Sequence, residues 1–108
     1  MSRLVACVPD LMDRSKVAAV APDTTFCHTP GELRAVAVRV GAALAVVDLS
    51  REGALEAIAE LCQAAVATIG FGSHVDRALL DAATQAGCGR VVPRSVFFRD
   101  LAGLLGPG

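Results

Sequence analysis

The side chain best placed to do chemistry is Asp48, a carboxylate that directly follows the apolar run of residues 41–47. A short apolar run without polar alternation is typical of a strand covered on both faces, and Asp48 would then stand at its carboxyl end. Open α/β sheets bind their ligands at the carboxyl ends of their strands. We therefore expect Asp48 to bind a ligand or accept a group there, with a structural bond to the loop after the first strand as the alternative.

Further polar and small residues follow the other expected strands and would share this edge of the sheet with Asp48. The candidates for a pocket or an anion-binding site are Asp10, Gly72, Ser73, His74, Arg94 and Ser95. Glycines that lead into a helix and an arginine fork both suit the binding of a phosphate group. The structural alternatives are helix N-caps for Asp10, Ser73 and Ser95, and solvated surface positions for His74 and Arg94.

The composition excludes several classes of protein. The chain has 108 residues, which suits a single domain spanning 1–108. Ten basic and eleven acidic residues are scattered along it, so we expect no direct nucleic-acid binding. The longest apolar segment, residues 35–47, is interrupted by Arg39 and is too short to cross a membrane. Pro9 and Asp10 cut off the apolar stretch at the amino terminus, which predicts a cytoplasmic protein without a signal peptide.

The cysteines give no sign of a metal or redox site. The four cysteines are Cys7, Cys27, Cys62 and Cys88. They are widely spaced, form no Cys-x-x-Cys pair and have no histidine at the spacing of a zinc site. We therefore expect four reduced, buried thiols that act as small apolar side chains.

The chain repeats one pattern five times: an apolar run, a cap or turn, and then a helical pattern. The expected strands are residues 4–8, 24–27, 65–69 and 90–93, with the apolar run within residues 41–50, which stops on Asp48, as the central strand. Strands that alternate with helices at this spacing predict right-handed βαβ units and a parallel sheet. Five units in one small domain predict a flavodoxin-like, doubly wound (βα)5 three-layer sandwich with strand order 2-1-3-4-5. The short, more polar second strand suits an edge of this sheet.

The helix ends are marked by capping residues. Asp10 suits the N-cap of the first helix, and Thr29 with Glu32 forms a capping box before the second, which ends near Gly41. Ser73 and Ser95 are expected to cap the fourth and fifth helices, with residues 70–72 as the turn after the fourth strand.

Apolar spacing predicts which faces of the helices are buried. In the third helix the expected buried stripe is Leu55, Ile58, Ala59 and Cys62. In the fourth helix it is Val75, Leu79, Ala82, Ala83 and Ala86. The last helix carries Phe97, Leu101, Leu104 and Leu105 on one stripe and would stop at residues 106–108.

The order of these residues resembles that of a response-regulator receiver domain (CheY-like) over the whole chain. Asp10 follows the first strand, Asp48 the third, Ser73 the fourth and Pro93 the fifth. The resemblance implies that Asp48 accepts a phosphoryl group, that Asp10 and Asp48 hold Mg²⁺, and that Ser73 contacts the phosphoryl group. Metal and ammonium charges would neutralise the negative charge that develops in this reaction.

The chain departs from that family in three places. Pro9 replaces one residue of the usual acidic pair, and Ser73 comes three residues after the expected strand end. The lysine expected after the fifth strand is missing, because the only lysine is Lys16 and Arg94 follows Pro93 instead. Arginine does not replace an ammonium point charge in such a role. The resemblance is therefore closest to atypical or pseudo-receiver domains, whose phosphoacceptor pocket is degenerate.

These observations predict a stand-alone signalling module that binds a protein partner or a second copy of itself and is not an enzyme. The expected interface is the face of the fourth helix, fifth strand and fifth helix, where Val96, Phe97 and Phe98 are too many apolar neighbours for one stripe to bury. One alternative is a Mg²⁺-dependent phosphoacceptor modified on Asp48. Another is a sensor of a small phosphate-bearing ligand, held by Gly72, Ser73, Arg94 and Ser95. No certain cofactor is expected in the leading interpretation.

Overall fold

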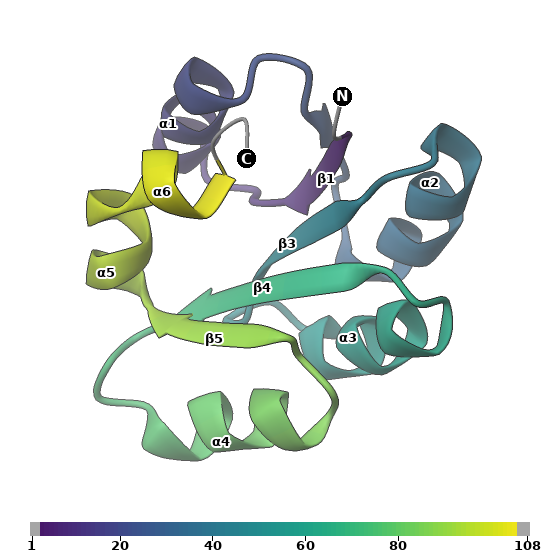
Figure 1. The fold of residues 1–108 in the computed structure, drawn as a ribbon. Helices are drawn as coiled ribbons and strands as arrows, with labels where there is room; N and C mark the ends of the chain where they lie inside the picture. The colour runs from purple at the N-terminus through teal and green to yellow at the C-terminus, as the bar shows by residue number, and fades with distance from the viewer. Residues whose placement is uncertain (1–2, 106–108) are drawn as a thin grey trace.

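A computed structural model describes residues 3–105 of the chain. Five parallel strands form one sheet in the order β2-β1-β3-β4-β5, which confirms the predicted topology (Figure 1). The strands are β1 (Leu4–Cys7), β2 (Thr25–Phe26), β3 (Leu44–Asp48), β4 (Ala67–Gly72) and β5 (Arg90–Pro93). The two-residue β2 lies at one edge of the sheet, as its polar composition predicted, and β5 lies at the other.

Helices cover both faces of the sheet and make the predicted three layers. They are α1 (Leu11–Val20), a short 3-10 helix (Pro30–Glu32), α2 (Leu33–Val40), α3 (Ala54–Gln63), α4 (Arg77–Gln85), α5 (Arg94–Arg99) and α6 (Leu101–Leu105). One core cluster joins the sheet to α2, α3 and α4, and the other joins it to α1, α5 and α6 (Figure 1). No helix within residues 3–105 is long and apolar enough to cross a membrane.

The central strand is buried because it carries core side chains on both faces. β3 pairs in parallel with β1 on one side and with β4 on the other, so that Cys7 lies beside Val47 and Asp48 beside Phe71. Val46 packs into one core cluster, while Ala45 and Val47 pack into the other. The strand therefore ends on Asp48 at the edge of the sheet formed by the carboxyl ends of the strands, as the apolar run of the sequence predicted.

The fourth strand is longer than predicted, and the expected turn at residues 70–72 is wrong. β4 continues through Gly72 because the Phe71 ring is a fully buried core residue, stacked on Phe97 with a centroid distance of 4.5 Å. Gly70 allows a close approach of Leu49: a Cβ atom at position 70 would lie 2.8 Å from its Cδ2 atom. In a strand such a glycine marks close packing rather than a turn.

The buried stripe of α3 is shifted by one residue from the predicted one. The residues buried are Ala54, Ala57, Ile58 and Leu61, so that only Ile58 of the expected stripe is correct. Alanine weakens the pattern, because alanines line both possible stripes and do not distinguish them. Cys62 is therefore exposed, whereas Cys7, Cys27 and Cys88 are buried as predicted and all four are free thiols.

Two predicted N-caps are wrong, and their helices begin at other residues. Asp76 caps α4 by accepting from Leu79 N at 3.1 Å, while Ser73 lies in the loop before it and its Oγ accepts from Val75 N at 3.4 Å. α5 begins at Arg94, directly after Pro93 with φ −60°, so Ser95 lies inside the helix. β5 thus runs into α5 without a loop that could supply a serine cap.

Other predicted helix ends are confirmed. The Asp10 side chain caps α1, and the Glu32 side chain accepts from Thr29 N at 2.9 Å in the capping box. Gly41 ends α2 in the left-handed conformation, with φ 66°. The predicted last helix is divided at Asp100 into α5 and α6, and its expected stop at residues 106–108 lies outside the described residues.

Candidate functional site at the carboxyl edge of the sheet

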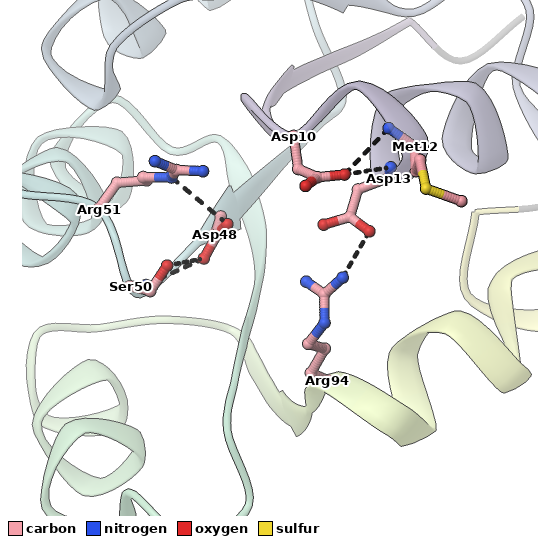
Figure 2. A network of polar contacts seen from close by, with 7 residues as sticks. All are labelled: Asp10, Met12, Asp13, Asp48, Ser50, Arg51 and Arg94. Atoms are coloured by element: carbon pink, nitrogen blue, oxygen red, sulfur yellow. Dashed lines mark hydrogen bonds and ion pairs between the residues drawn. The ribbon is translucent and has the colours of Figure 1, made fainter.

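The parallel strands deliver several charged side chains to one edge of the sheet. Asp10 caps α1 after β1, Asp48 ends β3, and Arg94 begins α5 after β5. The structure adds Asp13, which lies in the first turn of α1 and pairs with Arg94. Figure 2 shows the carboxylates of Asp10 and Asp13 above Arg94, with Asp48 across from them.

Asp10 is held by the backbone of the helix that it caps. Its Oδ1 atom accepts from Met12 N at 2.9 Å and from Asp13 N at 3.0 Å. The Asp13 N–H bond is the largest cause that lowers the pKa of Asp10 below its ordinary value, and the Met12 N–H bond and the charges of Arg94 and Arg51 also lower it. Both hydrogen bonds and cations favour the ionised carboxylate. Asp10 is therefore an exposed, charged acid with one oxygen free of internal contacts.

Asp13 is a buried acid that sequence reasoning missed. It is 2% exposed, and its Oδ1 atom accepts from Arg94 Nη2 at 2.5 Å. Its Oδ2 atom is buried and has no hydrogen-bond partner. In the sequence Asp13 is only an acid in the first turn of a helix, a common position near the positive end of the helix dipole. Its spacing of three from Asp10 placed it close to the site, but nothing local showed that it faces Arg94.

The Arg94 guanidinium lies between Asp13 and the rings of Phe98 and Phe71. Its guanidinium carbon is 4.8 Å from the Phe98 ring centroid and 5.8 Å from that of Phe71. The hydrogen bond to Asp13 is the main cause that raises the pKa of Arg94, and the charges of Asp13, Asp48 and Asp10 add to it. All three carboxylates therefore stabilise the charged form of Arg94, although only Asp13 accepts a hydrogen bond from it.

Asp48 is turned toward the loop that follows its own strand. It is 5% exposed, and its Oδ1 atom accepts from Ser50 N at 3.0 Å and from Ser50 Oγ at 2.7 Å. Its Oδ2 atom lies 3.6 Å from Arg51 Nε. The bond expected to the loop after β1 is therefore replaced by an Asx-type turn in the loop after β3. Both oxygens of Asp48 are engaged, one strongly and one weakly.

Within residues 3–105, the remaining predicted site residues make no hydrogen bond or ion pair with Asp10, Asp13, Asp48 or Arg94. Ser73, His74 and Ser95 are exposed, and Gly72 is buried in β4 beside Pro93. A phosphate-binding glycine turn at residues 70–72 is therefore wrong, because these residues form a strand. Ser73 directly follows β4, closer to the edge of the sheet than the sequence indicated.

The predicted interface residues differ in exposure. Phe97 is fully buried and is withdrawn as an interface residue, because it stacks inside the core on Phe71. Phe98 is half-buried and meets Phe97 edge-on with a centroid distance of 4.9 Å. Val96 is half-buried as well. Of the expected apolar triplet, only Val96 and Phe98 retain surface that a partner could contact.

The arrangement does not fit a Mg²⁺ site as it stands. Within residues 3–105 no three histidine, cysteine, aspartate or glutamate side chains converge as metal ligands. Mg²⁺ requires near-ideal octahedral oxygen coordination. Asp10 and Asp13 each use one oxygen in an internal contact and Asp48 uses both, so the expected pair of Asp10 and Asp48 is not set up to hold the ion.

One hollow of about 310 Å³ lies elsewhere, beside α2 and α3. It is lined by Gly31, Arg34, Ala35, Val38 and Glu60. None of the predicted site residues lines it. The candidate site is therefore a network of charged side chains at the sheet edge and is not this hollow.

Comparisons with known proteins agree on the fold. No family model matches the chain, and no curated protein sequence matches it. A response regulator from Hahella chejuensis superimposes with a TM-score of 0.82 at 12% identity, over 96% of this chain and 92% of that one. Chemotaxis protein CheY4 from Vibrio cholerae has a TM-score of 0.80 at 12% identity, over 97% and 96% of the two chains.

A third solved structure carries a metal. The Mn²⁺-bound form of the response regulator Rcp1 has a TM-score of 0.71 at 13% identity, over 96% of this chain and 91% of that one. Sequence identities this low show the fold and leave the chemistry of the site to its own residues. The chain therefore has the fold of response-regulator receiver domains.

Proposed function

We propose that this chain is a receiver-fold signalling module that acts by binding a protein partner, with phosphorylation at Asp48 lost or weakened. The observation that carries the proposal is the ion pair between Arg94 and the buried Asp13. This pair joins the start of α5 to the first turn of α1 by a direct contact between the two side chains. The arginine that follows β5 is thereby engaged with an acid of the protein itself.

The contacts of Asp48 support the same proposal. A carboxylate that attacks a phosphoryl group needs an oxygen directed at the donor and positive charge to neutralise the transition state. Asp48 instead directs Oδ1 at Ser50 and leaves Oδ2 3.6 Å from Arg51. β5 ends at Pro93, which offers no side-chain donor. The phosphoacceptor chemistry of the fold is therefore poorly supported by these residues.

Incubation with a small phosphoryl donor and Mg²⁺, followed by intact-mass measurement, tests this part of the proposal. We expect no gain of a phosphoryl group by the wild-type chain. The matched control is Asp48→Asn, which keeps the side-chain volume and removes the acceptor. A stoichiometric mass gain that disappears in Asp48→Asn would show a working Mg²⁺-dependent phosphoacceptor and would refute the proposal.

A sensor of a small phosphate-bearing ligand is the weaker alternative. The arginine that such a sensor would use, Arg94, is already paired with Asp13. The glycine residues expected to form a phosphate-binding turn lie within β4 instead. Stabilisation of the protein by phosphate-bearing metabolites measures this alternative, because a ligand that binds only the folded chain raises its melting temperature. We expect no saturable rise.

The proposed partner surface is the face formed by α4, β5 and α5, with a second copy of the chain as its simplest occupant. β5 is an edge strand, and Val91, Val92 and Pro93 are only half-buried, whereas all four residues of β1 are buried. A sheet edge with partly exposed apolar side chains is a surface that proteins usually cover or pair. Val96 at the start of α5 extends this apolar surface.

Sedimentation velocity over a range of concentrations tests this surface. We expect the wild-type chain to self-associate and Val96→Glu to remain monomeric with an unchanged circular dichroism spectrum. Val38→Glu is the matched control, because Val38 is 64% exposed and lies on α2, which covers the face of the sheet opposite to α5 and Val96. If Val38→Glu dissociates the dimer and Val96→Glu does not, the proposed face is wrong.

A further inference from the structure

The acids at the sheet edge retain charge after their internal contacts are counted. Asp10, Asp13 and Asp48 bring three carboxylates to this edge, and Arg94 and Arg51 bring two guanidinium groups (Figure 2). The carboxylates therefore outnumber the guanidinium groups by one, and the network has a net charge of −1. A single positive charge would balance it, while a divalent ion would reverse its sign.

The acids also retain hydrogen-bond capacity. Asp10 commits one oxygen to backbone N–H groups and Asp13 commits one to Arg94, whereas Asp48 has one oxygen bonded to Ser50 and the other 3.6 Å from Arg51. The second oxygen of Asp13 is buried without a partner. Figure 2 shows this oxygen on the side of the Asp13 carboxylate that faces Asp48. A buried carboxylate oxygen without a donor is unfavourable, and a donor that reaches it would bind there.

We infer that this edge of the sheet binds a primary ammonium group. An ammonium carries one positive charge and N–H donors, which match the unbalanced charge and the buried Asp13 oxygen that lacks a donor. The chain's own lysine does not fill this role, because Lys16 Nζ lies over the Phe98 ring, 5.3 Å from its centroid. No set of three metal-type ligands converges within residues 3–105, so a divalent metal is a poorer fit.

The surroundings allow such a group to enter. The unpartnered oxygen is closed off from solvent, so binding requires a neighbouring side chain to turn aside. Asp10 is exposed and the Arg94 side chain is 47% exposed, so either can move without opening the core. Leu11 and Met12 follow Asp10 and are 74% and 72% exposed, which leaves apolar surface beside Asp10 for an alkyl stem.

The ammonium can come from a lysine side chain of a partner protein or from a free alkylamine. The inference deepens the proposed partner-binding function and rests on it, because a phosphoryl group on Asp48 would occupy the same edge. The two proposals fail separately. A phosphoryl mass gain refutes the proposed function, whereas the absence of amine binding refutes only this inference.

The test is a titration of the folded chain with n-butylammonium chloride, followed by thermal unfolding and by amide chemical shifts. We expect a saturable rise in melting temperature and shifts centred on the first turn of α1. The matched probe n-butyltrimethylammonium has the same charge and no N–H donor, so we expect roughly tenfold weaker binding. An equal response to both cations, or no saturable response, overturns the inference.

Variants place the site within the chain. Asp13→Asn should weaken butylammonium binding by roughly tenfold or more. Asp10→Asn should weaken it less while preserving the helix cap, since asparagine is an equally good N-cap, and it serves if Asp13→Asn fails to fold. The exposed Asp81 on α4 supplies the control, and Asp81→Asn should bind as the wild type does. Loss of binding in Asp81→Asn, or full binding in Asp10→Asn, overturns the assignment.

The source of the ammonium is decided by a second ligand. Nα-acetyl-lysine amide presents the same ammonium on a side chain flanked by peptide groups. Binding as tight as that of butylammonium supports a protein partner, and binding of butylammonium alone supports a free amine. Mg²⁺ binding that competes with butylammonium and exceeds it in affinity would overturn the inference in favour of a metal site.

Discussion

Replacement of Arg94 by alanine should destabilise the chain because it leaves the buried Asp13 without its partner. Removal of one partner of a fully buried ion pair costs about 3–5 kcal/mol. The Asp13 side chain is 3% exposed, but that of Arg94 is 47% exposed, so water screens the pair. We therefore expect a loss of about 2 kcal/mol, which lies between the buried value and the roughly 0–1 kcal/mol of a surface pair.

A double-mutant cycle separates this ion pair from the other contacts of Arg94. Its guanidinium also lies over the Phe98 ring, a contact that contributes about 0.5–1 kcal/mol and is lost whether or not Asp13 is charged. The free energy of unfolding in urea is measured for Arg94→Ala, Asp13→Asn and the double variant. We expect a coupling energy of about 1.5 kcal/mol, since the double variant no longer contains the unpaired acid.

The exposed pair of Arg99 and Asp100 is the matched control. Its atoms are 3.6 Å apart, and its side chains are 70% and 52% exposed. The same cycle on this pair should give a coupling energy below about 0.5 kcal/mol. If Arg94→Ala costs no more than Arg99→Ala, or if the coupling between Arg94 and Asp13 is near zero, Asp13 is not the buried charge that the structure describes.

Three further predictions concern stability. Ala65 has φ 59° and is exposed, so Ala65→Gly should relieve a left-handed conformation that costs about 1–2 kcal/mol and raise the urea midpoint. Gly70→Ala should lower the melting temperature, because the added Cβ atom would lie 2.8 Å from Leu49 Cδ2. Gly72→Ala, whose added Cβ atom has its nearest contact at 3.4 Å, should leave the melting temperature nearly unchanged. Equal effects of the two substitutions would contradict the packing of β4. The pKa of Asp10 lies below its ordinary value of 3.8, so the ionised side chain stabilises the fold above that pH. This stabilisation is lost as the pH falls through the lowered pKa. The difference in urea midpoint between the wild type and Asp10→Ala should therefore shrink in acid.

The sequence determined the topology because local patterns were enough to define each element. The apolar run before Asp48 marked a strand covered on both faces, and Asp10, Thr29 and Gly41 marked helix ends through their own side chains or backbone conformation. Capping and left-handed glycine act over a few residues, so a single sequence contains all that they depend on. The alternation of strands and helices then left one parallel sheet as the expected fold.

Tertiary structure decided which side chains meet and which face is buried. Asp13 and Arg94 are 81 residues apart and pair only because α1 and α5 pack on the same face of the sheet. Phe71 and Phe97 are likewise core partners, which extended β4 and removed Phe97 from the expected interface. Contacts between distant segments depend on how the layers pack, and no local pattern of apolar or charged residues contains that information.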